Sequence, residues 1–122
     1  METATRYSVT VPLADNDGTP IPLDVLLAIE TRILNMAGGF TRATVVGAWR
    51  PDDRLEDADV VYDESRVYSF DVAQGAPYDG VPVLAAQLRG LAQFVAVACD
   101  QDCVYVTRET IAREFVPQPE LG

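Results

Sequence analysis

Two kinds of hydrophobic pattern alternate along this chain, and their order is the feature that most constrains its fold. Two long segments repeat apolar residues at helical spacing, and shorter segments around them alternate apolar with polar residues as strands do. The patterns read strand, helix, strand, strand, helix, strand. A chain of 122 residues forms one domain and buries enough surface to fold without metal or disulfide support.

The helices are expected at residues 23–37 and 82–98. In the first segment Leu26, Ile29, Ile33 and Met36 share one helical face, and Gly38-Gly39 provides a left-handed end. The second segment begins after a candidate cap, Asp79, and contains a glycine, Gly90, at a position that often lets another backbone approach. Its apolar stripe consists of Leu84, Leu88, Leu91, Val95 and Ala98.

The strands are expected where polar and apolar residues alternate, at Arg6–Leu13, Thr41–Arg50, Ser65–Val72 and Cys103–Thr107. Residues 60–62 are expected to extend a hairpin arm before the third strand. Residues 111–116 form either a short helix or an edge strand. The ends, 1–5 and 117–122, are expected to be disordered, and 51–59 and 74–80 to be loops.

This order predicts a single α+β domain over residues 1–122 with the ferredoxin-like βαββαβ fold. Its four-stranded antiparallel sheet would carry both helices on one face and leave the other face open. Exposed apolar area of this kind usually marks an interface, so we expect a homodimer through the open face. The side chains expected there are Arg6, Ser8, Thr10, Val46, Ala48, Val67, Ser69 and Tyr105.

The charge of the chain excludes several partners. It has 19 acidic residues and 9 basic ones, all of them Arg, and a net charge of −10. Such a field repels phosphate backbones and anionic lipid, so neither direct nucleic-acid binding nor membrane binding is expected. The absence of a long apolar run, and of a basic segment followed by an apolar one at the start, predicts a cytoplasmic protein. The scattered acids indicate a composition bias of the genome or, alternatively, a surface that mimics nucleic acid.

The sequence has no His and no Lys, which removes the usual catalytic triads, His-based metal sites, Schiff-base chemistry and phosphate-binding lysines. The only thiols, Cys99 and Cys103, could bridge across a turn or supply half of a metal site. Free, partly buried thiols fit better, because a structural zinc site needs four ligands. We therefore expect no cofactor, no metal and no catalytic residue.

A turn is expected at Asp15-Asn16-Asp17-Gly18. Acidic loops of this kind also bind calcium, but the register that uses Asp15, Asp17 and Gly18 puts Leu13 where the first oxygen ligand belongs. A plain turn is therefore the better interpretation.

One group of residues is a candidate ligand site. If the hairpin between the second and third strands forms, aromatic, acidic and basic side chains gather at one edge. Two guanidinium groups there could hold a small anion, with an aromatic ring to stack on it. The alternative is a ladder of solvent-exposed ion pairs. The candidate residues are Trp49, Arg50, Tyr62, Asp63, Glu64 and Arg66.

The chain also resembles short uncharacterised proteins of phages, plasmids and prokaryotic genomes. The resemblance is carried by Tyr7–Leu13, Gly38–Thr41, Gly47–Arg50, Asp63–Tyr68 and Cys103–Val106. It implies a compact α+β domain of mobile-element origin and brings no activity with it.

These observations favour a non-catalytic, homodimeric binding module, an accessory protein of a phage or mobile element whose ligand is a small anion or a host protein. The runner-up is a small cofactorless enzyme of the dimeric α+β barrel kind, which would use Asp63, Glu64 or a Tyr. The third hypothesis is an acidic mimic of nucleic acid, which requires carboxylates clustered on one face.

Overall fold

The computed structural model describes residues 1–50, 60–73 and 82–120. The loops expected at 51–59 and 74–80, and the expected cap Asp79, lie outside the described residues. The elements are β1 (Glu2–Pro12), α1 (Leu23–Ala37), β2 (Thr41–Trp49), β3 (Val61–Ala73), α2 (Pro82–Ala98) and β4 (Val106–Arg113).

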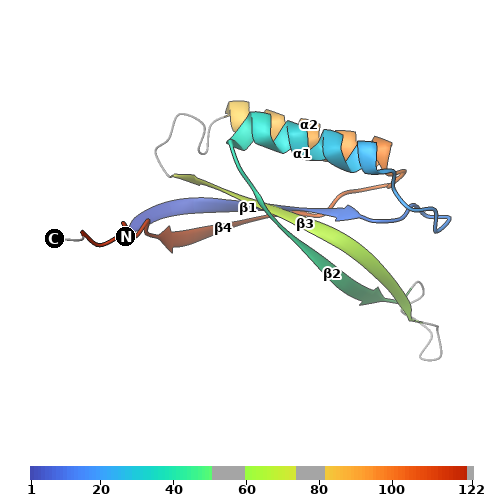
Figure 1. Cartoon of the computed structure of the whole chain (residues 1–122). Helices are drawn as coiled ribbons and strands as arrows, with labels where there is room; N and C mark the ends of the chain where they lie inside the picture. Colours follow the sequence, from blue (N-terminus) through green and yellow to red (C-terminus); the bar gives the residue numbers. More distant parts are fainter. Residues whose placement is uncertain (51–59, 74–81, 121–122) are drawn as a thin grey trace.

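The strands form one antiparallel sheet in the order β2-β3-β1-β4. Figure 1 shows both helices on the same face of this sheet. The two central strands, β1 and β3, pair from Ala4↔Ala73 to Pro12↔Ser65. This is the ferredoxin-like α+β arrangement that the order of the sequence patterns predicted.

Both helices begin and end at the residues that the hydrophobic spacing and the flanking residues indicated. Gly38 adopts φ 82°, and its backbone N–H donates to the carbonyl of Leu34 at 2.8 Å. Leu26, Ile29 and Ile33 are buried against the sheet. No helix in the described part of the chain is long and apolar enough to cross a membrane.

The core lies between the helices and the face of the sheet that they cover. Its strand residues are the alternate positions of β1 and β3, and the rings of Tyr7 and Phe70 stack at 5.7 Å between centroids. Leu91 and Val95 on α2 close it from above. The fully buried large side chains are Tyr68, Ile29, Ile33, Val9, Val11, Val95 and Cys99.

Two strand expectations were wrong at their ends. β1 begins at Glu2 rather than Arg6, so residues 2–5 are ordered in a strand, and Ala4 and Thr5 are buried. Ala4 pairs with both Ala73 and Ile111, because strands on both sides continue along it. Pairing with neighbours that are distant in sequence therefore extends β1 past the segment in which alternation was visible.

β4 starts at Val106 and continues to Arg113, later than the expected Cys103–Thr107. Its register with β1 runs from Val9↔Val106 to Glu2↔Arg113. Residues 111–113 therefore belong to this edge strand and not to a helix. β3 starts at Val61, so it includes most of the expected hairpin arm.

The ends of β2 and β3 that form the hairpin curve away from the helix layer (Figure 1). Every residue of β2 is exposed. The register pairs Val46 with Glu64 and Arg42 with Tyr68, and directly paired residues project to the same side of a sheet. Val46 and Ala48 therefore lie on the side of Tyr68, not on the open face as expected; the open-face residues of β2 include Val45 and Trp49.

The middle of the open face is polar. The guanidinium of Arg6 donates to both carboxylate oxygens of Asp71 at 2.8 and 3.1 Å, and this pairing holds the pKa of Asp71 below its usual value. The hydroxyls of Ser8 and Ser69 are 3.0 Å apart. Homodimer formation through this face stays a prediction, and these paired polar groups give it less apolar area than expected.

Replacing Gly90 by alanine is expected to raise the free energy of unfolding by about 1 kcal/mol, because glycine has the poorer helix propensity. A Cβ at Gly90 would meet no atom of the described residues within 4 Å. Within that part of the chain the expected close backbone approach is absent, and no contact opposes the gain in stability. Urea unfolding of Gly90→Ala measures it. Gly38→Ala is the matched control: its Cβ also has open space, but φ +82° strains an alanine and should lower stability by ~1 kcal/mol. A loss of stability in Gly90→Ala would contradict the prediction.

Candidate functional site

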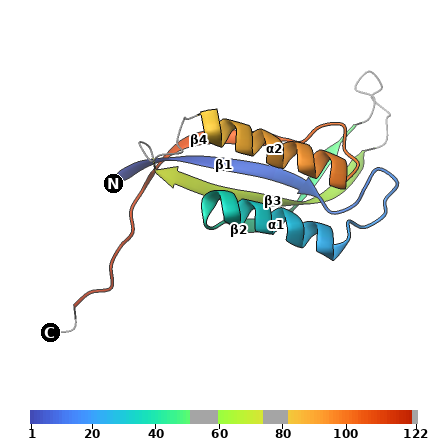
Figure 2. The same ribbon diagram turned by 90° about the horizontal axis from the view of Figure 1, so that it is seen from above.

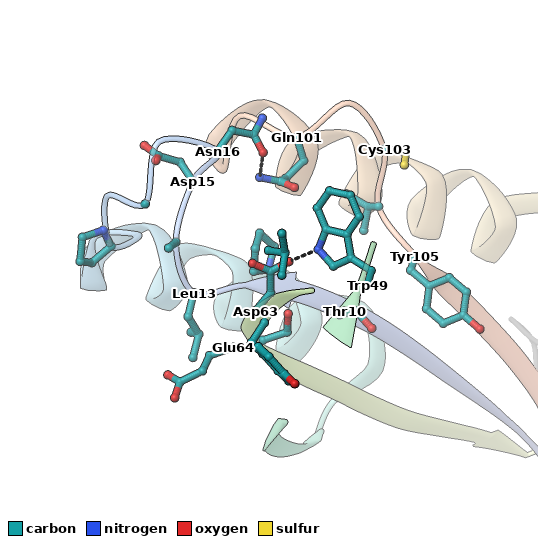
Figure 3. A pocket seen from close by; sticks show the side chains of 18 residues that line it. Thr10, Leu13, Asp15, Asn16, Trp49, Asp63, Glu64, Gln101, Cys103 and Tyr105 are labelled. Carbon is teal, nitrogen blue, oxygen red and sulfur yellow. Dashed lines mark hydrogen bonds between the residues drawn. The ribbon is translucent and has the colours of Figure 1, made fainter. Parts of the chain in front are cut away.

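A pocket of about 770 Å³ lies at the end of the sheet where β1 and β2 end and β3 and β4 begin. Figure 3 shows side chains around it from β1, β2 and β3, from the β1–α1 loop and from the segment between α2 and β4. The loops are the connection from β1 to α1 and the turn after α2. Its volume is in the range of small-molecule sites, and residues far apart in sequence meet there because four strand ends converge.

Three aromatic rings contribute to the lining: Trp49, Tyr62 and Tyr105. The indole Nε1 of Trp49 donates to Oδ2 of Asp63 at 2.6 Å, across the β2–β3 pair (Figure 3). The residue exposures are 52% for Trp49 and 71% for each tyrosine, so these rings are accessible to a ligand. The hydrogen bond to Asp63 fixes the orientation of the Trp49 indole.

The two loops are held together on one side of the pocket. Oδ1 of Asp15 accepts from the backbone N–H groups of Asp17 and Thr19, each at 2.9 Å, which closes the turn expected from the sequence. The side-chain amide of Asn16 donates to the carbonyl of Asp100 at 3.0 Å and accepts from Gln101 at 3.4 Å (Figure 3). These contacts connect the β1–α1 loop to the turn after α2.

The charge in the pocket is negative. Asp15, Asp63 and Glu64 are among the lining residues, and the described lining residues include no Arg. Asp63 projects to the side of Trp49, whereas Glu64, the next residue of β3, projects to the opposite face of the sheet (Figure 3). Thr10 and Ser65 add hydroxyl groups. This lining attracts cations, stacks on flat rings and accepts hydrogen bonds. It is poorly suited to the small anion that the sequence suggested, because carboxylates repel it.

The six candidate residues from the sequence separate in the structure. Trp49, Tyr62, Asp63 and Glu64 all line the pocket, whereas Arg50 and Arg66 are not among its lining residues. Arg66 pairs with Thr44, two residues along from the Arg42↔Tyr68 pair and therefore on the same face of the sheet, and its side chain faces α1. Alternation along β3 separates it from Asp63, because side chains three positions apart in a strand point to opposite faces.

Arg66 belongs to a second polar cluster between α1 and the sheet. Oε2 of Glu30 accepts from the hydroxyl of Tyr68 at 2.7 Å, from Arg42 at 2.6 Å and from Arg66 at 3.3 Å. Burial alone would raise the pKa of Glu30, but these hydrogen bonds and the two positive charges outweigh it and lower that pKa. Burial raises the pKa of Tyr68. The cluster is internally satisfied, which indicates a structural role.

The two cysteines differ in their surroundings. Both are free thiols; Cys99 is buried and Cys103 is exposed. Burial raises the pKa of the Cys99 thiol, which disfavours the reactive thiolate. Cys103 is among the lining residues of the pocket.

Sequence reasoning missed the pocket residues that lie outside the hairpin. They come from the end of β1, the two loops and the segment before β4, and no local pattern marks them. A search for turn residues would have found only Asp15 and its neighbours. The missed residues that carry polar or aromatic groups are Thr10, Asp15, Asn16, Gln101, Cys103 and Tyr105.

No protein-family model matches the chain, and no curated protein matches it by sequence. Among solved structures, it is similar to a phage SAM lyase in complex with S-methyl-5'-thioadenosine, with TM-score 0.59 and 12% identity over 93% of each chain. It is also similar to the periplasmic divalent cation tolerance protein CutA from Archaeoglobus fulgidus, with TM-score 0.53 and 9% identity over 92% of this chain and 87% of that one.

A third similar structure is a Bacillus cereus protein related to NIF3, with TM-score 0.53 and 10% identity. The alignment covers 92% of this chain but only 26% of that protein, so this chain spans about a quarter of its length. At such low identities these similarities define the class of fold, ferredoxin-like α+β, and no activity.

Proposed function

We propose that this protein is a non-catalytic binding module whose ligand is a small cation that carries a flat ring. The observation that carries the proposal is the composition of the pocket lining. The accessible indole of Trp49 lies beside the Asp63 carboxylate, further aromatic and acidic residues are among the lining residues, and those described include no Arg. A cation over an aromatic face is attracted by the ring quadrupole, and nearby carboxylates strengthen this attraction.

S-Adenosylmethionine is the first ligand to test, because it combines a sulfonium cation with an adenine ring. The chain is similar in fold to a phage SAM lyase over 93% of both chains. This similarity supports the choice only because it shows that a protein of the same fold is a SAM lyase. It also agrees with the resemblance to short phage proteins, so we propose that the chain is an accessory protein of a phage or mobile element.

The test is isothermal titration calorimetry with S-adenosylmethionine, neutral S-methyl-5'-thioadenosine and inorganic phosphate. We expect binding of S-adenosylmethionine, roughly tenfold weaker binding of the neutral nucleoside because it lacks the charge, and no heat with phosphate. Binding of phosphate in preference to the cation would overturn the proposal and favour the small anionic ligand expected from the sequence. No heat with any of the three would remove this ligand class.

Two substitutions separate the contributions of ring and charge. Trp49→Leu is expected to weaken binding of S-adenosylmethionine by roughly tenfold, because it removes a stacking and cation–π surface. Asp63→Asn keeps an acceptor for the Trp49 indole but removes a charge, so it should weaken the cation several-fold and leave the neutral nucleoside unchanged. Phe115→Leu, at an exposed ring outside the pocket, is the matched control. Equal losses for both nucleosides in Asp63→Asn would contradict a charge effect.

The second candidate is a cofactorless enzyme that uses the same pocket. It is favoured by the presence of Tyr62, Asp63 and Glu64 among the lining residues. It is disfavoured by the exposure of all three, since a catalytic carboxylate is usually desolvated, and by the strand alternation that points Asp63 to the opposite face from Tyr62 and Glu64. Mass spectrometry of S-adenosylmethionine incubated with the protein separates the two functions. Intact ligand supports a binding module, and time-dependent formation of S-methyl-5'-thioadenosine supports an enzyme.

The hypothesis of an acidic nucleic-acid mimic gains little support. Several carboxylates are paired with arginine, as in Glu2–Arg113 at 2.7 Å and Arg6–Asp71 at 2.8 Å. Paired carboxylates present less free negative charge to a partner.

A further inference from the structure

The outer edge of β2 is exposed along its whole length. β2 is the terminal strand of the described sheet, and all nine of its residues are exposed. Its apolar side chains include Val45, Val46 and Trp49, with 39%, 66% and 52% exposure. Native proteins usually cover or charge such an edge, because its free N–H and C=O groups pair readily with another chain.

A second exposed element follows β4. Residues 114–120 carry no assigned helix or strand, and Figure 2 shows the chain leaving the sheet and running away from the domain. Phe115 and Val116 are each 80% exposed. Phe115 packs only loosely against its own domain, with the guanidinium carbon of Arg113 5.1 Å from its ring centre. Two adjacent large apolar residues are thus presented to solvent on an extended segment.

The prolines of this segment suit it to one particular kind of pairing. Along an extended strand, successive backbone N–H groups point to opposite edges. Pro117 and Pro119 are two positions apart, so both missing N–H groups fall on the same edge. The other edge keeps its donors at Val116 and Gln118. A strand of this kind can pair along one edge only, and its prolines protect the outer edge from further addition.

The charges of the two elements are complementary. Residues 41–50 contain Arg50 and Arg42 and no acidic residue, although Arg42 is already paired with Glu30. Residues 114–120 contain Glu114 and Glu120 and no basic residue. Because each element has its charges near its two ends, either strand direction brings opposite charges together.

We propose that residues 114–120 of one copy of the chain add as a fifth strand along the free edge of β2 of a second copy. The donor segment follows β4 and the acceptor is β2, and these are opposite edges of the sheet; the donor segment runs out from the end of the sheet, away from the domain (Figure 2). The contact is therefore heterologous. A contact of this type closes into a ring of copies or propagates as a filament.

The first test measures the mass of the full-length chain by light scattering and native mass spectrometry over a concentration series. Gln118→Pro removes a donor from the pairing edge and is expected to weaken association by about tenfold or more. Gln118→Ala, which keeps the N–H, is the matched control and should associate as the unchanged chain does. Equal association of the proline and alanine variants would overturn the proposal and favour the open sheet face.

The second test uses the heterologous nature of the contact. Val46→Asp puts a charge in the middle of the acceptor strand, where pairing would remove it from water at a cost, and leaves the donor intact. Thr107→Asp on β4 is the control for added charge and should have no effect. Val46→Asp and Gln118→Pro should each associate at least about tenfold more weakly alone than the unchanged chain does. Their mixture should form a one-to-one pair, because each supplies what the other lacks. A mixture that stays monomeric while the unchanged chain associates would contradict the proposal. Because neither variant changes a pocket residue, this result is independent of ligand binding.

Discussion

Replacing Ile29 by alanine is expected to lower the free energy of unfolding by about 2–5 kcal/mol, the range for large-to-alanine changes in a core. Ile29 has 0% exposure and lies in the middle of α1. Truncating the Ile29 side chain leaves a cavity between α1 and the sheet, and the surrounding residues relax only in part to fill it. Urea denaturation followed by circular dichroism measures the loss, which is a large part of the stability of a domain this size.

Leu27→Ala is the matched control for Ile29→Ala. It lies on the same helix and shortens a branched aliphatic side chain, but Leu27 is 52% exposed, so the expected loss is below about 1 kcal/mol. If the two variants lose equal stability, the burial of α1 against the sheet is not as described.

Replacing Glu30 by glutamine is expected to lower the free energy of unfolding at pH 7 by about 2 kcal/mol. One carboxylate oxygen of Glu30 accepts from Tyr68, Arg42 and Arg66, and hydrogen bonds to charged groups contribute about 1.5–3 kcal/mol. The Glu30 side chain is 12% exposed and that of Arg66 19%, so water compensates poorly for the lost charge. The Arg42 side chain is 49% exposed and contributes least.

The effect of Glu30→Gln is expected to depend on pH. The pKa of Glu30 is lower in the folded chain than its ordinary value of 4.5, so its contribution is complete above pH 4.5 and is lost as pH falls through the folded pKa. The difference in unfolding free energy between the unchanged chain and Glu30→Gln should therefore shrink below about pH 4.5. Asp102→Asn, in the exposed turn after α2, is the control. A difference that stays constant down to pH 2 would refute the assignment.

The helices could be predicted from local sequence because every signal that defines them lies within a few turns. Ile29 and Ile33 set the buried face of α1, and Pro22 and Gly38 bracket it. Proline at the start and glycine at the end act on backbone angles directly. The ends 23–37 and 82–98 therefore did not depend on the rest of the fold.

The strands could be predicted only in part, because a strand ends where its partner ends. Residues 2–5 showed no clear alternation, but neighbours on both sides extend β1 to Glu2. The fourth strand was predicted around the apolar residues Val104–Val106. In the structure, pairing with β1 starts at Val9↔Val106, so the strand begins at Val106 and continues to Arg113. Local propensity could not reveal these partners.

The sequence predicted part of the candidate site, the part that the β2–β3 hairpin contributes. The hairpin brings Trp49 near Asp63, as the sequence suggested, since the two lie on strands that follow each other. Arg66 was grouped with Asp63 despite the period of two along a strand, and attention to that period would have separated them. The contribution of Asn16, Gln101 and Tyr105 required long-range packing, because these residues come from three other parts of the chain.

The sequence by itself determined the helices, the order of elements, the ferredoxin-like fold and the acidic charge, because periodicity and composition are local properties. The tertiary structure alone decided where the strands end, that Arg66 serves the Glu30 cluster, and that a negative, aromatic pocket forms where four strand ends meet. These outcomes depend on which distant segments pair and in which register. A shift of one residue in that register would exchange the two faces of the sheet and, with them, the residues that line the pocket.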